Sequence, residues 1–341
     1  HILHVVFVLR SVSILGSTGS IGKNTLEVIS SLSERFRLYG ISCNRNISLL
    51  NDQITKHKPT VAVITDEKKY TEFVNQHGSR IGNTDILYGE EGLKEISSHK
   101  AVDIVVAAIV GFTCLRPVMN AISSNKTIII ANKEILVSAG ELIISSLKKS
   151  KARLLPVDSE HNALLQVILS SGLEYRINDK NYYKSKLNNL TITASGGPFI
   201  DLEISEFKNI KSKHAIKHPT WNMGKKISVD SSTMMNKGLE IIEAKLLFNL
   251  DLENINAIIH RQSKVHALVE FFDGSTIAHM AEPDMKIPIS YSLTFPDRIY
   301  KSASEKTSYD SLTFEDIPIS KFPCYTLADL LQKWEKFWIN S

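Results

Sequence analysis

Acidic and amide side chains occur in two short segments at spacings that could hold a divalent cation. Asp158 and Glu160 are separated by one residue at the end of a strand-like run, so an extended backbone points both carboxylates the same way. On a helix, Asn236, Glu240 and Glu243 fall at i, i+4 and i+7 and share one face. Oxygen ligands of this kind suit Mg²⁺ or Mn²⁺ equally. The alternatives are an N-cap with a first-turn acid for the pair, and a surface salt-bridge face for the helix.

Glycine- and hydroxyl-rich segments near these acids could bind a phosphate. Residues 229–233 read Val-Asp-Ser-Ser-Thr just before the acidic helix, and residues 195–197 read Ser-Gly-Gly after a predicted strand. Glycines free backbone N–H donors for an anion, although a plain loop would look the same. Residues 218–224 carry an imidazole, an indole and a thioether in a loop bounded by Pro and Gly, which predicts either a lid or a loop pinned by a buried Trp.

A second kind of chemistry is indicated by Gly16, Gly19 and Gly22, which follow a short strand and open a helix. In that context glycines let the backbone approach a pyrophosphate while the helix N-terminus supplies N–H donors. NAD sites place an acid about 20 residues further on, but here the next strand leads to Arg45, which could pair with a 2′-phosphate. The segment therefore favours NADPH. A tight turn, with Arg45 as a solvated charge, is the alternative.

These segments require two kinds of scaffold. Continuous apolar runs at residues 61–64, 102–109 and 127–131, separated by helical stretches, predict a doubly wound, Rossmann-like parallel sheet over residues 1–155. Asn132, Lys133 and Glu134 then lie at the carboxyl end of a strand, where such sheets bind ligands.

Beyond this sheet the pattern changes. Strands are predicted at residues 190–194, 257–260, 265–272 and 275–280, and a helix from about residue 235 to residue 250. We expect an α+β catalytic domain over residues 156–295 with its lid near 214–225. Residues 296–341 are expected to form a linker and one helix, at residues 327–338.

Composition narrows the function classes. The 341 residues are 43% hydrophobic and 22% charged with a formal net charge of +4, which is ordinary for a globular enzyme. No basic tract suggests nucleic acid, and no apolar run approaches the roughly 20 residues that span a bilayer. Three widely spaced cysteines favour a reduced, cytoplasmic chain.

In this order the segments resemble the 1-deoxy-D-xylulose 5-phosphate reductoisomerase family over residues 12–298. Residues 131–134, 157–163, 218–248 and 282–285 carry the resemblance most strongly. It implies conversion of 1-deoxy-D-xylulose 5-phosphate to 2-C-methyl-D-erythritol 4-phosphate in non-mevalonate isoprenoid synthesis, with NADPH and one Mn²⁺ or Mg²⁺. It also implies a homodimer located in a bacterial-type cytoplasm or, in a eukaryote, a plastid-type organelle.

The resemblance also implies a role for each matching residue. It assigns NADPH contacts to Gly16, Thr18, Gly19, Ser20, Ile21, Arg45, Asn46, Asn132, Glu134 and Gly224. It assigns the metal to Asp158, Glu160 and Glu240, and catalysis to these three with Lys133 and His218. Substrate contacts fall to Lys133, Ser159, Glu160, Ser195, His218, Ser231, Asn236, Lys237 and Glu240. Trp221 and Met223 match a closing lid.

Two other hypotheses stay open at this point. The family continues into a C-terminal helical bundle, so the chain could be a truncated homologue that binds NADPH or sugar phosphate without turnover. Alternatively, Cys114 could be the nucleophile of a semialdehyde dehydrogenase, another class with a strand followed by a glycine loop. That class leaves the acidic segments unexplained.

Overall fold

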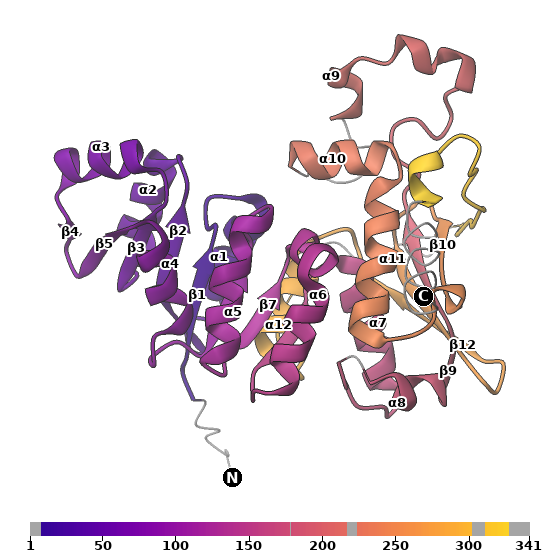
Figure 1. Ribbon diagram of the computed structural model, residues 1–341, viewed down its shortest axis with the longest axis horizontal. Helices are drawn as coiled ribbons and strands as arrows, with labels where there is room; N and C mark the ends of the chain where they lie inside the picture. The colour runs from indigo at the N-terminus through magenta and orange to yellow at the C-terminus, as the bar shows by residue number, and fades with distance from the viewer. Residues whose placement is uncertain (1–7, 178, 217–223, 302–310, 327–341) are drawn as a thin grey trace, which may run out of the picture. The chain divides into compact units, whose positions relative to one another are not determined.

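The computed structural model describes residues 8–177, 179–216, 224–301 and 311–326, and the chain divides into two compact units. The first unit comprises His1–Val157 with Met285–Ser302, and the second comprises Asp158–Asp284 with Ala303–Ser341. Each unit has its own sheet (Figure 1).

The first unit is built on an eight-stranded sheet in the order β4-β5-β3-β2-β1-β6-β7-β8. Its pairings are parallel except that of β4 with β5. The strands are β1 (Arg10–Leu15), β2 (Phe36–Cys43), β3 (Val61–Ile64), β4 (Arg80–Ile81), β5 (Thr84–Tyr88), β6 (Ile104–Ala107), β7 (Thr127–Ile130) and β8 (Arg153–Pro156). The chain moves outward from β1 in one direction and returns at β6 to fill the other side. This is the Rossmann arrangement, with its switch point between β1 and β6.

Helices cover both faces of this sheet (Figure 1). They are α1 (Ser20–Ser31), α2 (Ile47–His57), α3 (Glu67–His77), α4 (Gly89–Ser98), α5 (Leu115–Ser123) and α6 (Lys133–Lys148). The central strands are buried on both faces, which is why they are apolar throughout: β3 and β6 have no exposed residue. The expected doubly wound α/β class is confirmed.

One helix from late in the chain also belongs to the first unit. In α12 (Lys286–Thr294), Ile289 and Leu293 join the core of this unit, and the hydroxyl of Ser292 donates to the carbonyl of Pro156 over 3.1 Å. The helix packs against α1. Residues 285–295, expected with the second domain, therefore pack with the first. Local sequence pattern does not show which core an apolar helix joins.

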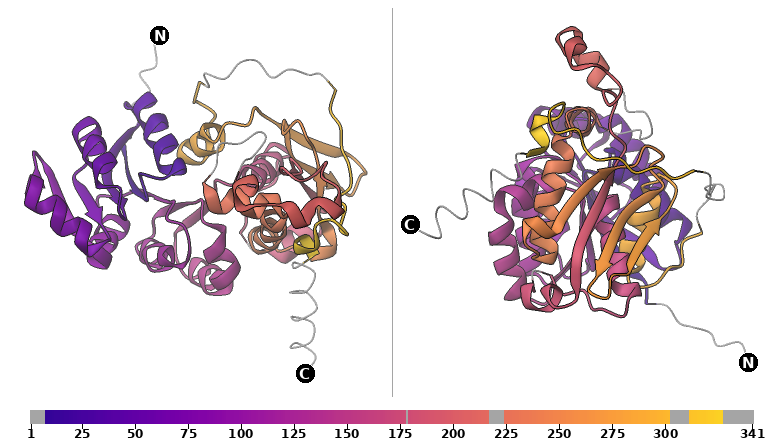
Figure 2. Two further views of the ribbon diagram at one scale, coloured as in Figure 1. Left: turned by 90° about the horizontal axis from the view of Figure 1, so that it is seen from above. Right: turned by 90° about the vertical axis from the view of Figure 1, so that its right-hand side faces the viewer.

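The second unit contains a four-stranded sheet in the order β10-β9-β11-β12 (Figure 2). Its strands are β9 (Leu187–Ala194), β10 (Ile255–Ile259), β11 (Val265–Phe271) and β12 (Thr276–Met280). Only β9 and β10 pair in parallel. The helices are α7 (Ser159–Ser170), α8 (Lys180–Lys184), α9 (Ser212–Ala215), α10 (Lys225–Ser232) and α11 (Met235–Phe248), of which α7 and α11 pack on the sheet.

Differences from the sequence-based expectations have local causes. Helix α7 begins at Ser159 rather than near residue 162, so the acidic pair lies at a helix start. Residues 229–232 form the end of α10, although Ser, Asp and Val are weak helix formers. The predicted helix at 327–338 lies outside the described residues. Among the described helices, none is long and apolar enough to cross a membrane.

Candidate active site

The acidic cluster of the second unit brings together side chains from two helices. Asp158 precedes α7, Glu160 lies in its first turn, and Glu240 lies on α11. One carboxylate oxygen from each residue lies within 4.8 Å of the others. Asp158 occupies the N-cap position of α7, as the alternative interpretation expected, but its side chain makes no capping hydrogen bond, so capping alone does not account for this acid. Three hard oxygen donors this close, with Glu240 only 1% exposed, form a set that a Mg²⁺ or Mn²⁺ ion fits.

Lys237 supplies positive charge to this cluster. Its ammonium donates to Glu160 Oε1 over 2.8 Å, to Glu240, and to the carbonyl of Thr193 over 2.6 Å. Burial acts to lower the pKa of Lys237, but the two carboxylates raise it well above its usual range. For Glu160, burial and the Glu240 charge act to raise the pKa, and the contact with Lys237 outweighs them to give a lowered pKa. Glu160 and Lys237 therefore form an ion pair of opposite charges inside the cluster.

Two smaller groups fix the orientation of the carboxylates. The hydroxyl of Ser159 donates to Glu160 Oε2 over 2.7 Å, and the amide of Asn236 donates to Glu240. Asn236 and Glu240 are one helical turn apart, as the i, i+4 spacing predicts. Ser159, Asn236 and Lys237, which the resemblance assigns to substrate, thus contact the acids in this structure.

Sequence reasoning missed the role of His161 in this cluster. His161 is fully buried on α7, its Nε2 donates to the carbonyl of Glu240 over 2.8 Å, and its Nδ1 lies 3.5 Å from Glu243 Oε2. Burial acts to lower the pKa of His161, but the surrounding carboxylates outweigh it and the net shift is upward. Through these two contacts the His161 ring ties α7 to α11. Its spacing of three residues from Asp158 on a helix was the available signal.

The segments of the second unit that are predicted to bind phosphate also lie close together. Gly196 and Gly197 both adopt positive φ, and a Cβ on Gly197 would lie 2.8 Å from the carbonyl of Ser231. Only glycine lets the residues after β9 approach the end of α10 so closely. The backbone N–H of Gly197 donates to the hydroxyl of Ser195 over 3.3 Å. Ser195 and Ser231 are therefore held on neighbouring segments, next to the strand end that Lys237 contacts.

In the first unit, the glycine loop has the geometry that the cofactor interpretation requires. Gly16 has a φ of 88° and a Cβ there would lie 2.8 Å from the carbonyl of Ala108, while a Cβ on Gly22 would lie 2.4 Å from the carbonyl of Gly16. Both positions exclude any side chain. A cavity of about 410 Å³ opens beside Gly16, Thr18 and Gly19 and is lined by the carboxyl ends of β1, β2 and β6, at the switch point of the sheet. Ser20 and Ile21 form the first turn of α1.

The remaining residues expected to contact NADPH take part in the scaffold. Arg45 donates to Asp66 over 2.8 Å yet stays 76% exposed, and its neighbours Asn44 and Thr65 line the cavity. Asn46 caps α2. Asn132 caps α6 and donates to the carbonyl of Gly111 over 2.8 Å.

Lys133 is buried at the start of α6, Glu134 is partly exposed beside it, and Gly224 is exposed before α10. His218, Trp221 and Met223 lie outside the described residues. Cys114 is fully buried, and burial raises the pKa of its thiol to about 12, which makes it a poor nucleophile.

A dinucleotide-type sheet with a glycine loop, on the same chain as a carboxylate cluster that fits a divalent cation, defines a metal-assisted, nucleotide-dependent oxidoreductase.

Comparison with known proteins narrows this class. Three family models match the chain. The model of 1-deoxy-D-xylulose 5-phosphate reductoisomerase matches residues 12–140, and the model of the C-terminal domain of that enzyme matches residues 154–248. The model of the DXP reductoisomerase C-terminal domain matches residues 280–336. The enzyme of this name from Caldanaerobacter subterraneus is 43% identical over 94% of this chain and 81% of its own length. That from Idiomarina loihiensis is 40% identical over 98% of this chain and 84% of its own. The chain belongs to the 1-deoxy-D-xylulose 5-phosphate reductoisomerase family.

Solved structures agree. A DOX-P reductoisomerase in complex with NADPH, fosmidomycin and magnesium superposes with a TM-score of 0.86 at 41% identity, over 94% of this chain and 78% of that one. The Zymomonas mobilis enzyme in complex with NADPH gives a TM-score of 0.82 at 36% identity, over 94% of this chain and 80% of that one.

Proposed function

We propose that this chain converts 1-deoxy-D-xylulose 5-phosphate to 2-C-methyl-D-erythritol 4-phosphate, with Asp158, Glu160 and Glu240 holding one divalent cation. The reaction follows from family membership, and the convergence of three carboxylates on one point carries the residue assignment. When bound, the cation would chelate neighbouring oxygens of the ketose phosphate and stabilise negative charge that develops on them.

The chain's own residues would then bind and orient the substrate. Ser195, Ser231, Asn236 and Lys237 are the proposed phosphate donors. Lys237 has two candidate partners, the carboxylates it contacts here and the phosphate. We propose that its ammonium is released to the phosphate once a cation neutralises Glu160 and Glu240. Lys133 and His218 are proposed as further substrate contacts, with Trp221 and Met223 as a lid that excludes water.

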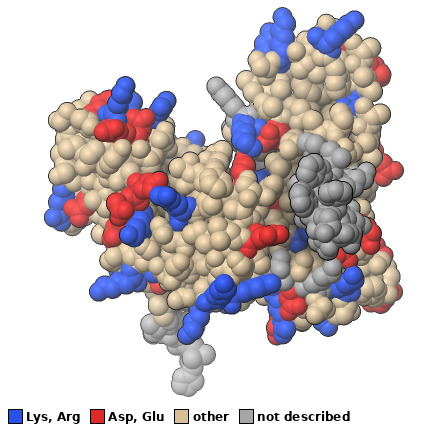
Figure 3. All heavy atoms as spheres, in the orientation of Figure 1, with Lys and Arg blue, Asp and Glu red and all other residues tan. Residues whose placement is uncertain are grey.

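The first unit would supply the reductant. The glycine loop and the N-terminus of α1 are suited to a pyrophosphate, and Arg45 beside the cavity is the proposed partner of the 2′-phosphate. Rearrangement of the carbon skeleton yields an aldehyde. NADPH held there would supply the hydride for the aldehyde carbon, and one proton would go to the aldehyde oxygen. On the face drawn in Figure 3, basic and acidic side chains are interspersed, so recognition of an anionic substrate is expected to depend on local contacts.

The test is NADPH oxidation, followed by absorbance, with 1-deoxy-D-xylulose 5-phosphate and with or without Mn²⁺. We expect metal-dependent turnover that falls about a hundredfold or more in Glu240→Gln, because a ligand is lost. Glu253→Gln, which alters an exposed carboxylate of the same unit, should match wild type. Metal-independent turnover would contradict the assignment. NADPH binding without turnover under any divalent cation would indicate an inactive homologue.

We also propose a homodimer formed through strand β12. β12 is an edge strand whose first three residues are exposed, and Phe272 and Ile277 are 62% and 42% exposed. Among the described residues β12 pairs with β11 alone, and an edge of this kind with apolar side chains is suited to pairing with a second copy. Light scattering should give a dimer for wild type and a monomer for Ile277→Glu, with Ile204→Glu as the surface control. A monomeric wild type would contradict the proposal.

A cytoplasmic location is the corresponding expectation, since the curated relatives named above are bacterial enzymes; cell fractionation would test it.

A further inference from the structure

The glycine loop is held by a buried amide from a helix that lies well beyond it in the chain. Gln53 on α2 is 5% exposed, and it contacts Ser17, which follows Gly16 in the loop and is fully buried. The hydroxyl of Ser17 donates to Gln53 Oε1 over 2.6 Å, and Gln53 Nε2 donates back to the carbonyl of Ser17 over 2.9 Å. One side chain thus satisfies both the hydroxyl and the backbone oxygen of a single loop residue.

The direction of these two bonds is fixed by chemistry. The carbonyl of Ser17 can only accept, so the atom of Gln53 that faces it must be the amide nitrogen. The amide oxygen then faces the hydroxyl, which donates. A rotated amide would place two oxygens against each other, so a glutamine in this one orientation completes the pattern.

Strand β2 provides the other support for Ser17. The backbone N–H of Ser17 donates to the carbonyl of Ser42 over 2.8 Å, and the N–H of Gly16 donates to the hydroxyl of Ser42 over 2.9 Å. A Cβ on Gly22 would also come within 2.5 Å of Ser17 Cα, so α1 starts directly against this residue. Ser17 is therefore the point at which the loop is anchored to β2, to α1 and to α2.

The position of Gln53 makes this anchor relevant to both the pyrophosphate and the 2′-phosphate of NADPH. The loop carries the backbone N–H groups proposed for the pyrophosphate, while α2, capped by Asn46, follows directly after Arg45, proposed for the 2′-phosphate. We propose that Gln53 is a positioning residue for NADPH, which fixes the loop conformation through Ser17 and couples it to the start of α2. This inference rests on the proposed use of NADPH.

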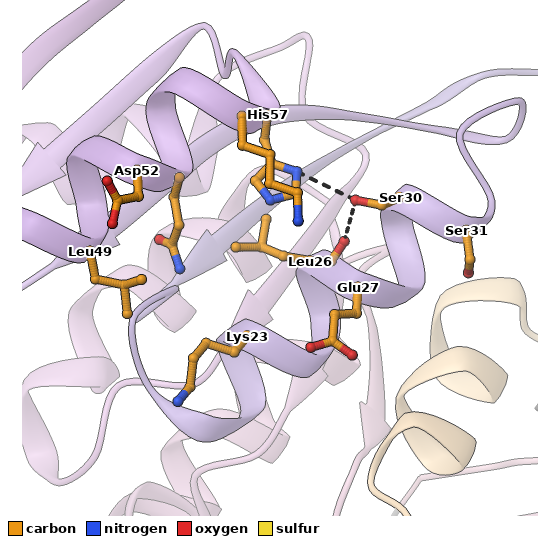
Figure 4. Close-up of a pocket in the computed structure, with 10 residues that line it drawn as sticks. Lys23, Leu26, Glu27, Ser30, Ser31, Leu49, Asp52 and His57 are labelled. Carbon is orange, nitrogen blue, oxygen red and sulfur yellow. Dashed lines mark hydrogen bonds between the residues drawn. The ribbon is translucent and has the colours of Figure 1, made fainter. Parts of the chain in front are cut away.

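The surroundings of Gln53 allow its positioning role to be tested without unfolding the protein. Gln53 also lines an open groove of about 510 Å³ between α1 and α2, together with Leu49 and Asp52 of α2 and Lys23 and Ser30 of α1. Figure 4 draws the residues of both helices that line this groove, with Ser30 hydrogen-bonded to the ring of His57. Truncating Gln53 opens onto this groove instead of leaving a closed cavity, so we expect the fold to survive.

The experiment measures NADPH affinity by nucleotide fluorescence in the full chain, without substrate, alongside KM values in turnover. We expect Gln53→Leu to weaken NADPH binding by roughly 5- to 30-fold, because the buried carbonyl of Ser17 loses its donor, while the Ser17 hydroxyl keeps the carbonyl of Ser42 at 3.2 Å as an acceptor. KM for the sugar phosphate should stay within about twofold, since the second unit is untouched. Ser30→Ala, in the same groove, should bind NADPH as wild type does.

Two further variants separate positioning from loss of packing. In a double-mutant cycle with Ser17→Ala, the effects on NADPH affinity should be less than additive. Either change removes the hydrogen bond from the Ser17 hydroxyl to Gln53 Oε1. Gln53→Glu should respond to pH, because a protonated carboxyl can donate to the Ser17 carbonyl and an ionised one cannot. Its affinity relative to wild type should rise at least threefold from about pH 8.5 to about pH 6. Wild type provides the reference for the other titrating or charged groups of the groove, which are Lys23, Glu27, Asp52, Lys56 and His57.

Three results would overturn the inference. These are additive effects in the double-mutant cycle, an equal rise of the KM values for NADPH and for the sugar phosphate, and a ratio of NADPH affinities between Gln53→Glu and wild type that does not change with pH. So would a wild type that does not bind NADPH, which would also contradict the proposed function. A wild type that binds NADPH without turnover would contradict the function alone, and the binding data would still decide the role of Gln53.

Discussion

Replacing Lys237 by Met should weaken the fold and at the same time strengthen metal binding. The side chain of Lys237 is 5% exposed, and its ammonium contacts Glu160 and Glu240, two of the proposed ligands. Met keeps most of the side-chain volume and removes the charge. Two carboxylates then face each other without a cation in the metal-free protein, and a metal ion has no competitor for their oxygens.

Both effects can be estimated. Removing one partner of a buried ion pair costs about 3–5 kcal/mol. For a unit of this size that lowers the Tm of the metal-free protein by roughly 6–20 °C. A unit charge about 4 Å from another is worth about 4 kcal/mol at an effective dielectric constant of about 20. Even a third of that, about 1.4 kcal/mol, makes Mn²⁺ binding about tenfold tighter.

The assay is thermal unfolding with and without Mn²⁺, together with Mn²⁺ titration followed by electron paramagnetic resonance, at a pH of about 8. Because the metal binds the folded state, its stabilisation of Lys237→Met should exceed its stabilisation of wild type. Lys226→Met is the matched control. Its partner Asp230 lies 2.6 Å away in an i,i+4 pair on a surface helix, which contributes about 0.3–0.5 kcal/mol. A folded Lys237→Met that binds Mn²⁺ no more tightly than wild type would refute the reasoning, because Lys237 would then not compete with the cation.

Three further predictions follow from local geometry. Gly22→Ala should abolish NADPH binding and lower the Tm, since its Cβ would meet backbone atoms at 2.4 Å; unchanged nucleotide affinity on titration would contradict the loop geometry. Alkylation of the native protein should modify Cys324, which is partly exposed, well before the buried Cys114 with its thiol pKa of about 12; equal rates by mass spectrometry would contradict this burial. The pKa of Glu160 is lowered from 4.5, so its contribution to stability is present above pH 4.5 and is lost as pH falls through the lower folded value. Acid unfolding of the metal-free protein, followed by circular dichroism, should therefore steepen below about pH 4.5, and less so in Glu160→Gln.

Much of the first unit could be predicted because its signals are local. The apolar strands are buried on both faces, and the glycine loop follows β1 in the sequence itself. The edge strand β4 and its neighbour β5 were missed, because β4 has two residues and β5 mixes buried and exposed positions and includes Asp85. Helix α12 was assigned to the wrong unit for a different reason. Its contacts with α1 and with Pro156 join residues separated by more than a hundred positions, and neither propensity nor spacing encodes them.

The acidic site, too, could be predicted from the sequence only in its local parts. Spacing alone grouped Asp158 with Glu160, and Glu240 with Asn236, because each pair lies within one turn or one extended step. The contact between the two groups depends on how α7 packs against α11. Lys237 was expected to bind phosphate, and its salt bridge to Glu160 spans 77 positions in the sequence. Local chemistry thus predicts which residues can act, while the burial that sets their charge state comes from packing. Packing also places the Lys237 ammonium against Glu160 and Glu240. The proposed transfer of this ammonium from the carboxylates to the substrate phosphate can therefore be measured.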